Sequence, residues 1–178
     1  MSINTKKIYF GFIGKLLKIN LTKKSVSTEE IDLDIARDFI GGAGYACRYL
    51  FDLIGKDTNP LSSENVLLIM TGPLCLTSAP SCARIVICSR SPYTGLWGEA
   101  NAGGFFGPEM KRAGYDGIVI SGKAEKPVFL NNFDNSVTVY SFRWKPVAFS
   151  SKYLEISEGP HKRLGVIQKY SPFGTRVL

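Results

Sequence analysis

The pattern of hydrophobic and polar positions predicts a chain made mostly of strands, with two helical regions between them. Alternating or continuous apolar runs predict strands over 14–21, 26–31, 66–70, 83–89, 117–122, 128–130 and 137–140. Only the polar turn 23–25 separates the first two, which favours a hairpin. Each half of the chain up to Tyr140 has strands flanking a helix, which allows a duplicated unit. This order favours an α+β fold with mixed or antiparallel sheets over a parallel doubly wound sheet.

Between residues 32 and 54, apolar positions recur at intervals of three or four, which predicts an amphipathic helix facing a core. Its apolar stripe consists of Ile35, Phe39, Ala43, Cys47, Leu50 and Ile54. Asp32 or Asp34 can cap the helix at its start. Because glycine is a poor helix former, the glycine-rich run 41–44 is expected to divide this region into two shorter helices.

The stretch 101–122 predicts a second helix that ends at Gly114 and has three glycines in its first turn: Gly103, Gly104 and Gly107. Each costs roughly 1 kcal/mol relative to Ala in a helix, so three together need a reason. One reason is a phosphate-sized cradle, because a helix N-terminus offers unpaired N–H groups and a partial positive charge. The other is a tightly packed corner between helix and strand without a ligand. Composition does not decide between them.

Arg84 stands at the entrance of the predicted strand 83–89, where it suits bidentate capture of a phosphate; the alternative is an ordinary surface arginine. The run 117–124 fits the first seven positions of a phosphate-binding P-loop. However, Ala124 occupies the position that requires a hydroxyl for Mg²⁺, and the preceding Ile-Val-Ile is typical of a strand. We therefore reject a P-loop.

The composition is that of an ordinary globular protein, with 44% hydrophobic and 21% charged residues in a chain of 178. One or at most two domains are expected. The uncharged run 66–83 contains Gly72, Pro73 and Pro80, which argues against a membrane-spanning helix. Lys15 interrupts the apolar run near the N-terminus and no cleavage site follows, so we expect no secretory signal and a cytoplasmic protein.

The four cysteines show no spacing typical of a metal site: Cys47, Cys75, Cys82 and Cys88 contain no C-x-x-C pair. The only histidine, His161, lies far from them in the sequence. We expect buried, reduced thiols that pack as small hydrophobic side chains.

The net charge of +7 is concentrated near the C-terminus. Residues 1–142 hold 15 Lys and Arg against 13 Asp and Glu, whereas residues 143–178 hold 7 against 2. A basic nucleic-acid-binding protein is therefore one hypothesis, which steeply salt-dependent DNA binding would support. The positive residues form no run and no base-stacking motif, so we expect neither a nucleic-acid partner nor a membrane partner.

A series of short motifs follows in order along the chain: Gly14-Lys15-Leu16 with Ile19-Asn20-Leu21-Thr22, Thr71-Gly72-Pro73-Leu74 with Thr77-Ser78-Ala79-Pro80, Ser91-Pro92 with Thr94-Gly95, residues 100–107, Lys111, Ala113-Gly114-Tyr115-Asp116 and residues 122–128. Through these motifs the chain resembles the N-terminal domain of the tungsten-dependent aldehyde:ferredoxin oxidoreductase family. The likeness runs from about Gly11 to Tyr140 with natural spacing.

The resemblance implies a platform for a bis-pterin cofactor that holds tungsten or molybdenum. The residues it assigns to cofactor binding are Arg84, Asn101, Ala102, Gly103 and Gly104. It also assigns to the backbone carbonyl of Asn101 a magnesium ion that bridges the two pterin phosphates. No catalytic residue is expected within this chain.

The resemblance further implies an enzyme that oxidises aldehydes to carboxylic acids and passes electrons through a 4Fe-4S cluster to ferredoxin. In the family, the cluster cysteines and the acid/base residues belong to later domains, which are absent from this sequence. The expected partners are ferredoxin and those remaining domains, with a homo-oligomer as an option. We expect the chain alone to be inactive. The alternative is a non-catalytic relic or a phosphate- or pterin-binding module.

Residues 145–178 resemble nothing in the family, which places a predicted boundary after residue 144. Strand and helix periodicity fades there as the charge becomes more positive. We expect a basic tail that packs poorly or is disordered, derived from a shifted reading frame or a truncated gene. The alternative is a genuine short form whose tail covers a sheet surface.

Overall fold

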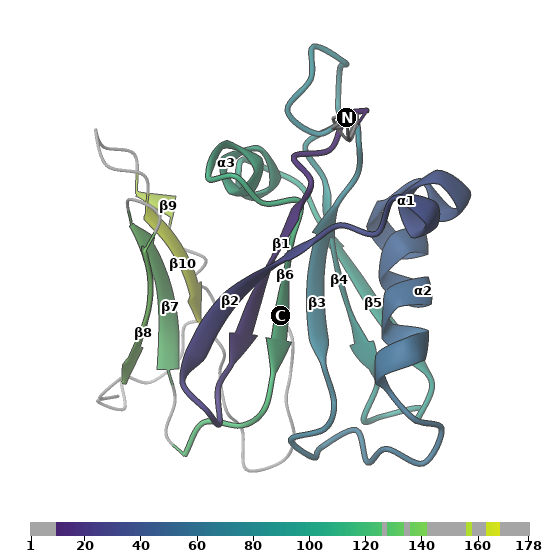
Figure 1. Cartoon of the computed structure of the whole chain (residues 1–178), viewed down its shortest axis with the longest axis vertical. Coiled ribbons are helices and arrows are strands. Elements are labelled where there is room, and N and C mark those ends of the chain that lie inside the picture. Colours follow the sequence, from purple (N-terminus) through teal and green to yellow (C-terminus); the bar gives the residue numbers. More distant parts are fainter. Residues whose placement is uncertain (1–9, 126–127, 134–135, 142–155, 158–162, 168–178) are drawn as a thin grey trace, which may run out of the picture.

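The computed structural model describes residues 10–125, 128–133, 136–141, 156–157 and 163–167 (Figure 1). In chain order, the elements are β1 (Lys15–Asn20), β2 (Ser25–Glu30), α1 (Leu33–Phe39), α2 (Gly42–Leu53), β3 (Leu67–Thr71), β4 (Ile85–Arg90), β5 (Trp97–Ala102), α3 (Phe106–Arg112), β6 (Gly117–Ser121), β7 (Val128–Phe133), β8 (Ser136–Ser141), β9 (Ile156–Ser157) and β10 (Arg163–Ile167). The hairpin β1–β2 and the other predicted strands are confirmed.

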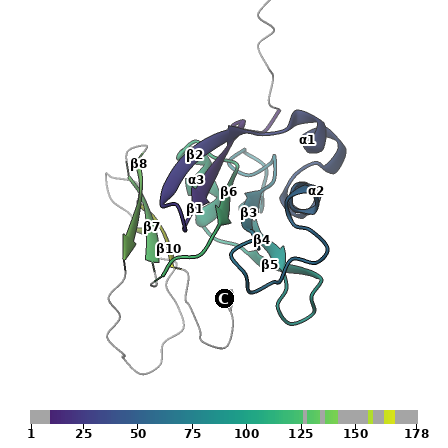
Figure 2. The ribbon, with the colours of Figure 1, turned by 60° about the horizontal axis from the view of Figure 1, so that its bottom comes forward.

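Six strands form a large mixed sheet in the order β2-β1-β6-β3-β4-β5. Strand β6 comes from the second half of the chain but lies between β1, to which it is parallel, and β3, to which it is antiparallel. The two halves of the sequence therefore share one sheet. Helices α1 and α2 cover one face of it, and α3 lies on the other (Figures 1 and 2). This arrangement confirms the predicted α+β class.

Strict alternation along the central strands produces a separate core on each face of the large sheet. Leu16 packs in the cluster under α1 and α2, while its neighbour Leu17 packs in the cluster under α3. On β3, Leu68 and Met70 point to the first cluster and Ile69 to the second. All five side chains are at least 97% buried, as expected for strands between two covered faces.

The first helical region divides as predicted, but its buried stripe differs from the prediction. Asp32 is the N-cap of α1 and accepts hydrogen bonds from the backbone N–H groups of Asp34 and Ile35 at 2.9 and 3.1 Å. Gly41 then separates α1 from α2. Four residues of the predicted stripe, Ile35, Ala43, Leu50 and Ile54, pack in or against the core, but Cys47 and Phe39 are exposed. The residues of α2 that face the sheet are Tyr45, Ala46, Tyr49 and Leu50.

The second predicted helix is shorter than expected, because α3 begins only at Phe106. Gly103 and Gly104 precede it in the loop after β5, and Gly107 alone lies in its first turn. The helix ends as predicted: Gly114 has φ +94°, and its N–H donates to the carbonyl of Lys111 at 2.9 Å. Tyr115 N–H donates to the carbonyl of Met110 at 3.2 Å, which completes a Schellman motif.

The sequence did not predict β5, which forms one edge of the large sheet. Its side chains are mostly exposed, so it lacks the apolar alternation that reveals a strand.

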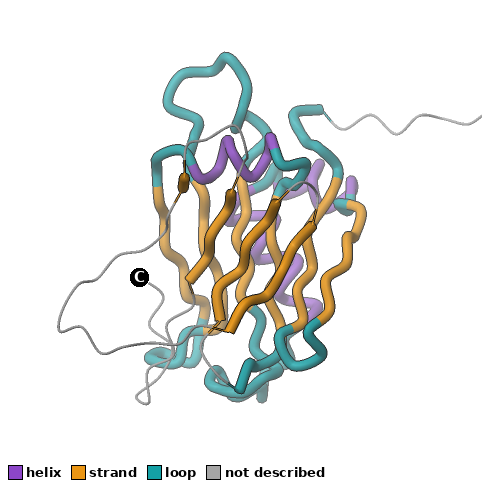
Figure 3. The backbone as a smooth tube through the Cα atoms, turned by 90° about the vertical axis from the view of Figure 1, so that its left-hand side faces the viewer, coloured by secondary structure: helices purple, strands orange, loops and turns teal. Residues whose placement is uncertain are grey.

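A smaller sheet has the order β8-β7-β10-β9. Figure 3 shows the strands of both sheets running in roughly the same direction. Within the predicted tail, β9 and β10 pair with each other, and β10 pairs with β7. The rest of the tail lies outside the described residues, and the boundary after residue 144 stays a prediction.

Candidate functional site

The register of β4 and β5 brings the predicted site residues to one end of this strand pair. Ile85 pairs with Ala102, and Val86 pairs with Asn101. The residues just beyond the last pair, Arg84 and Gly103, therefore leave the sheet side by side. Gly104 follows Gly103 in the same loop. Arg84 and residues 101–104, which belong to two separate segments of the sequence, thus meet at one end of the β4–β5 pair.

The Arg84 side chain is exposed, and it makes no hydrogen bond or ion pair with any other residue that the structure describes. Arg90, at the opposite end of β4, is different. Its Nε donates to the carbonyl of Gly95 at 2.8 Å and its Nη1 to the carbonyl of Gly55 at 3.0 Å, so it holds loops in place. The Arg84 guanidinium therefore has its donors available for an anion.

The glycines of the β5–α3 loop are not explained by packing against the chain. A Cβ atom built on Gly103 or Gly104 would meet no heavy atom within 4 Å. Gly104 also has φ +97°, a conformation that other residues rarely adopt. Both are exposed, so their backbone can be approached closely from outside. These properties fit a phosphate, although the donors come from a loop and not from the predicted helix N-terminus.

Gly107 fits the second hypothesis for these glycines, a tightly packed corner between helix and strand without a ligand. A Cβ built there would lie 3.1 Å from Cγ2 of Ile85, 3.2 Å from the carbonyl oxygen of Ala83 and 3.2 Å from Sγ of Cys75. At these distances the neighbours would have to shift by a few tenths of an ångström to admit a side chain. The glycine-rich stretch therefore combines an open loop with a close helix–strand contact.

Asn101 is exposed on the edge strand β5, and its Nδ2 donates to Oε1 of Glu99 at 2.9 Å. Carbonyl and carboxylate oxygens are the ligands that Mg²⁺ prefers. Within the part of the chain that the structure describes, no cluster of three or more His, Cys, Asp or Glu could hold a metal. A magnesium ion at Asn101 would therefore take further ligands from phosphate or water.

The four cysteines are free thiols, and two of them are buried as predicted. Burial raises the pKa of Cys88 to about 12 and also raises the pKa of Cys75. Both thiols are therefore protonated at neutral pH and are poor metal ligands, since the thiolate is the ligating form. The prediction was wrong for Cys47, which is exposed on α2, and Cys82 is only partly buried.

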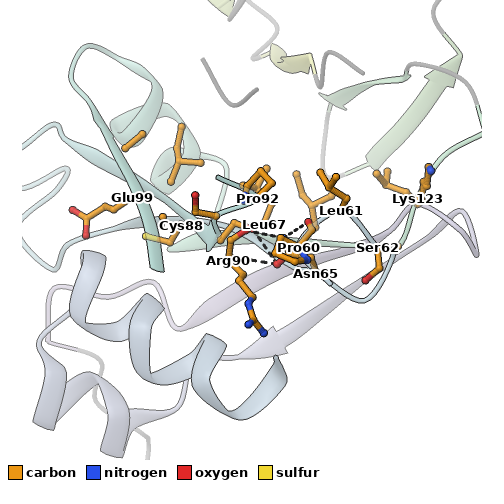
Figure 4. A pocket seen from close by; sticks show the side chains of 18 of the residues that line it. Pro60, Leu61, Ser62, Asn65, Leu67, Cys88, Arg90, Pro92, Glu99 and Lys123 are labelled. Carbon is orange, nitrogen blue, oxygen red and sulfur yellow. Dashed lines mark hydrogen bonds between the residues drawn. The ribbon is translucent and has the colours of Figure 1, made fainter. Parts of the chain in front are cut away.

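The structure also shows a cavity that the sequence did not reveal, with a volume of about 270 Å³ (Figure 4). Leu67, Ile87 and Ile120 line it from three strands of the sheet. Asn65 fixes one wall, because its Nδ2 donates to the carbonyl oxygens of Pro60 and Arg90 at 2.7 and 3.0 Å. The cavity lies at the Arg90 end of β4 and contains none of the predicted site residues. The predicted site residues lie together at the other end of β4, so the cavity is not part of the candidate site.

The fold and the motifs define the class of this protein, and comparison with known families agrees. The chain belongs to the family described as "Aldehyde ferredoxin oxidoreductase, N-terminal domain", whose model matches residues 16–155. The resemblance inferred from the sequence is thus confirmed. No helix in the described part of the chain is both long and apolar enough to cross a membrane.

Two named relatives with similar sequences are aldehyde ferredoxin oxidoreductases. The chain is 41% identical over 130 residues to the tungsten-containing aldehyde ferredoxin oxidoreductase of Pyrococcus furiosus and 40% identical over 130 residues to that of Pyrococcus abyssi. These matches cover 73% of this chain but only 22% and 21% of the two relatives. The chain therefore spans about a fifth of the length of these relatives.

A solved structure shares the fold. It is described as the active site complex BamBC of benzoyl coenzyme A reductase with 1,5-dienoyl-CoA, and it matches with a TM-score of 0.72 and 33% sequence identity. The match covers 74% of this chain and 20% of the other.

Proposed function

We propose that the chain is the part of a tungsten-containing, aldehyde-oxidising enzyme that binds the phosphates of a pterin cofactor. The observation that carries the proposal is the β4–β5 register, which places the exposed Arg84 beside Gly103. When bound, the cofactor would supply the metal centre at which the aldehyde is oxidised. The chain's own contribution is to bind and orient the cofactor.

Each residue at this end of β4 and β5 has a distinct role in the proposal. Arg84 binds a phosphate through two guanidinium N–H groups, a geometry that lysine cannot reproduce. Ala102, Gly103 and Gly104 allow the backbone to meet phosphate oxygens, as loops of successive N–H groups do. The carbonyl of Asn101 would hold a magnesium ion, whose charge would offset the negative charge of the phosphates.

The whole enzyme would oxidise aldehydes to carboxylic acids and transfer the electrons through a 4Fe-4S cluster to ferredoxin in the cytoplasm. This chain would not hold the cluster, because two of its four cysteines are buried, protonated thiols. The proposal therefore requires further domains, on this protein or in an oligomer. We expect no viologen-linked aldehyde oxidation from the purified chain alone.

Calorimetry with magnesium pyrophosphate tests the proposed site. We expect wild type to bind and Arg84→Met to bind at least about tenfold more weakly, because a charged hydrogen bond contributes about 1.5–3 kcal/mol. Arg84→Lys should fall between them. Arg37→Met is the matched control, since Arg37 is an exposed arginine on α1 that pairs with Asp34 and Asp38. Equal binding by wild type and Arg84→Met would contradict the proposal.

A phosphate- or pterin-binding module without catalysis would use the same residues. It predicts the same calorimetric result, but no activity when the remaining domains of a relative are supplied. Activity in that reconstitution would exclude this alternative.

A further inference from the structure

We propose that Gly107 is a positioning residue that sets the spacing between Arg84 and the loop glycines. The inference rests on the proposed function, because it concerns the same site. Gly107 does not touch the ligand in this proposal. It acts through the backbone on either side of Arg84.

The contacts of Gly107 fall on both neighbours of Arg84. Its missing side chain leaves space that is bounded by the carbonyl oxygen of Ala83 at 3.2 Å and by Cγ2 of Ile85 at 3.1 Å. A side chain at Gly107 would therefore push against the residues before and after Arg84, and against Cys75. Gly103 and Gly104 are joined to Gly107 by only two residues. The first turn of α3 thus connects the two halves of the site.

Helix α3 cannot withdraw from this contact without cost. Phe106 and Met110 are 1% and 0% exposed in the core under α3. Lys111 is also buried, and its Nζ donates to the carbonyl of Gly11 at 2.6 Å. Because these anchors hold the helix, a methyl group added at Gly107 would displace the entrance of β4, which carries Arg84.

A purely structural role for Gly107 makes a different prediction, and Gly98 provides the control. A Cβ built on Gly98 would lie 3.1 Å from Cβ of Ser91 and 3.3 Å from the carbonyl oxygen of Ser89. The crowding is therefore similar to that at Gly107, but it lies at the opposite end of β4. If only packing matters, Gly107→Ala and Gly98→Ala should behave alike.

The experiment measures thermal stability and magnesium pyrophosphate affinity for wild type, Gly107→Ala and Gly98→Ala. We expect both variants to lose stability by overpacking. Only Gly107→Ala should also lose affinity, by about tenfold, the effect of misplacing one charged hydrogen bond. Cys75→Ala in the Gly107→Ala background removes the Sγ atom at 3.2 Å and should restore much of the affinity, because the added methyl group can shift away from Ala83.

The outcomes separate this inference from the proposed function. If wild type does not bind the probe, both fail. If wild type and Gly107→Ala bind equally, or if Gly98→Ala loses as much affinity as Gly107→Ala, the positioning role fails and the proposed site stands. Should Gly107→Ala not fold, the same comparison is made between Cys75→Ala and the double variant, whose packing has room for the methyl group.

Discussion

The Nζ atom of Lys111 lies 3.4 Å from Oδ1 of Asp116, and the two side chains are 1% and 0% exposed. Asp116 also accepts hydrogen bonds from the backbone N–H groups of Ile13 and Gly14, at 3.0 and 2.7 Å. Lys111 donates to the carbonyl of Gly11. The ion pair therefore joins the end of α3 and the start of β6 to the segment that leads into β1. Each charge has partners beyond the other, as a buried charge requires.

Replacing Lys111 by Met should lower the free energy of unfolding by about 3–5 kcal/mol, because the buried Asp116 carboxylate loses its counter-charge. Methionine has a side chain of similar length, but it also removes the contact between Nζ and the Phe12 ring, whose centroid lies 5.5 Å away. Urea denaturation measures the effect.

The matched control for this prediction is an exposed ion pair. Arg37 contacts Asp34 at 3.2 Å, but the two side chains are 70% and 83% exposed. Arg37→Met should change the stability by at most about 1 kcal/mol. A Lys111→Met protein as stable as the control variant would show that the buried pair does not stabilise the fold.

The elements that the sequence predicted are those with a local apolar pattern. The side chains of β1 and β3 point alternately into the two cores, so these strands were predictable. The start of α1 was predictable as well, because Asp32 is a typical N-cap residue. Strand β5 has exposed residues on both faces and left no such pattern. The position of β6 between β1 and β3 depends on pairing over about 100 residues, which no local window contains.

The candidate site could be predicted only as a set of residue types. The motifs drew attention to Arg84 and to three glycines, but local sequence could not separate the open Gly103 from the packed Gly107. That difference arises from Cys75 and Ala83, which contact α3 from a distant segment. The buried partners of Lys111 were missed for the same reason.

Alkaline pH should destabilise the protein, because burial raises the pKa of Cys88 from 9.0 to about 12 and that of Tyr45 from 10.0 to about 12. The folded state therefore holds these protons more tightly than the unfolded state. Their contribution is complete below about pH 9 and is lost as the pH rises toward 12, by up to about 1.4 kcal/mol per pH unit for each group.

Urea denaturation at pH 8, 9.5 and 11 measures this pH dependence. Cys88→Ala removes one of the two groups, so its stability should fall less steeply above pH 9. A free energy of unfolding that stays constant up to pH 11 would be inconsistent with these raised pKa values.

The thiols should react in an order set by exposure and thiolate content. Cys47, exposed on α2, should react first with iodoacetamide at pH 8, and Cys82 should follow. Cys82 is slowed because its Sγ donates to the carbonyl of Ala79 at 2.9 Å. Cys75 and Cys88 should react only in urea, since both are buried and have raised pKa values. Peptide mapping by mass spectrometry gives the order, and native-state labelling of Cys88 as fast as that of Cys47 would contradict it.

Replacing Gly103 by Val should abolish binding of magnesium pyrophosphate without lowering stability. Gly103 does not have a positive φ, and a Cβ there would meet nothing within 4 Å, so the folded chain can accept valine. Its branched side chain would instead occupy the space from which an oxygen must approach the backbone. Gly104 is a poorer probe, since its φ of +97° would strain any other residue. Ala113→Ser, at the far end of α3, is the control and should bind as wild type does. Calorimetry and thermal denaturation give the two readouts, and a Gly103→Val protein that binds like wild type would place the phosphates elsewhere.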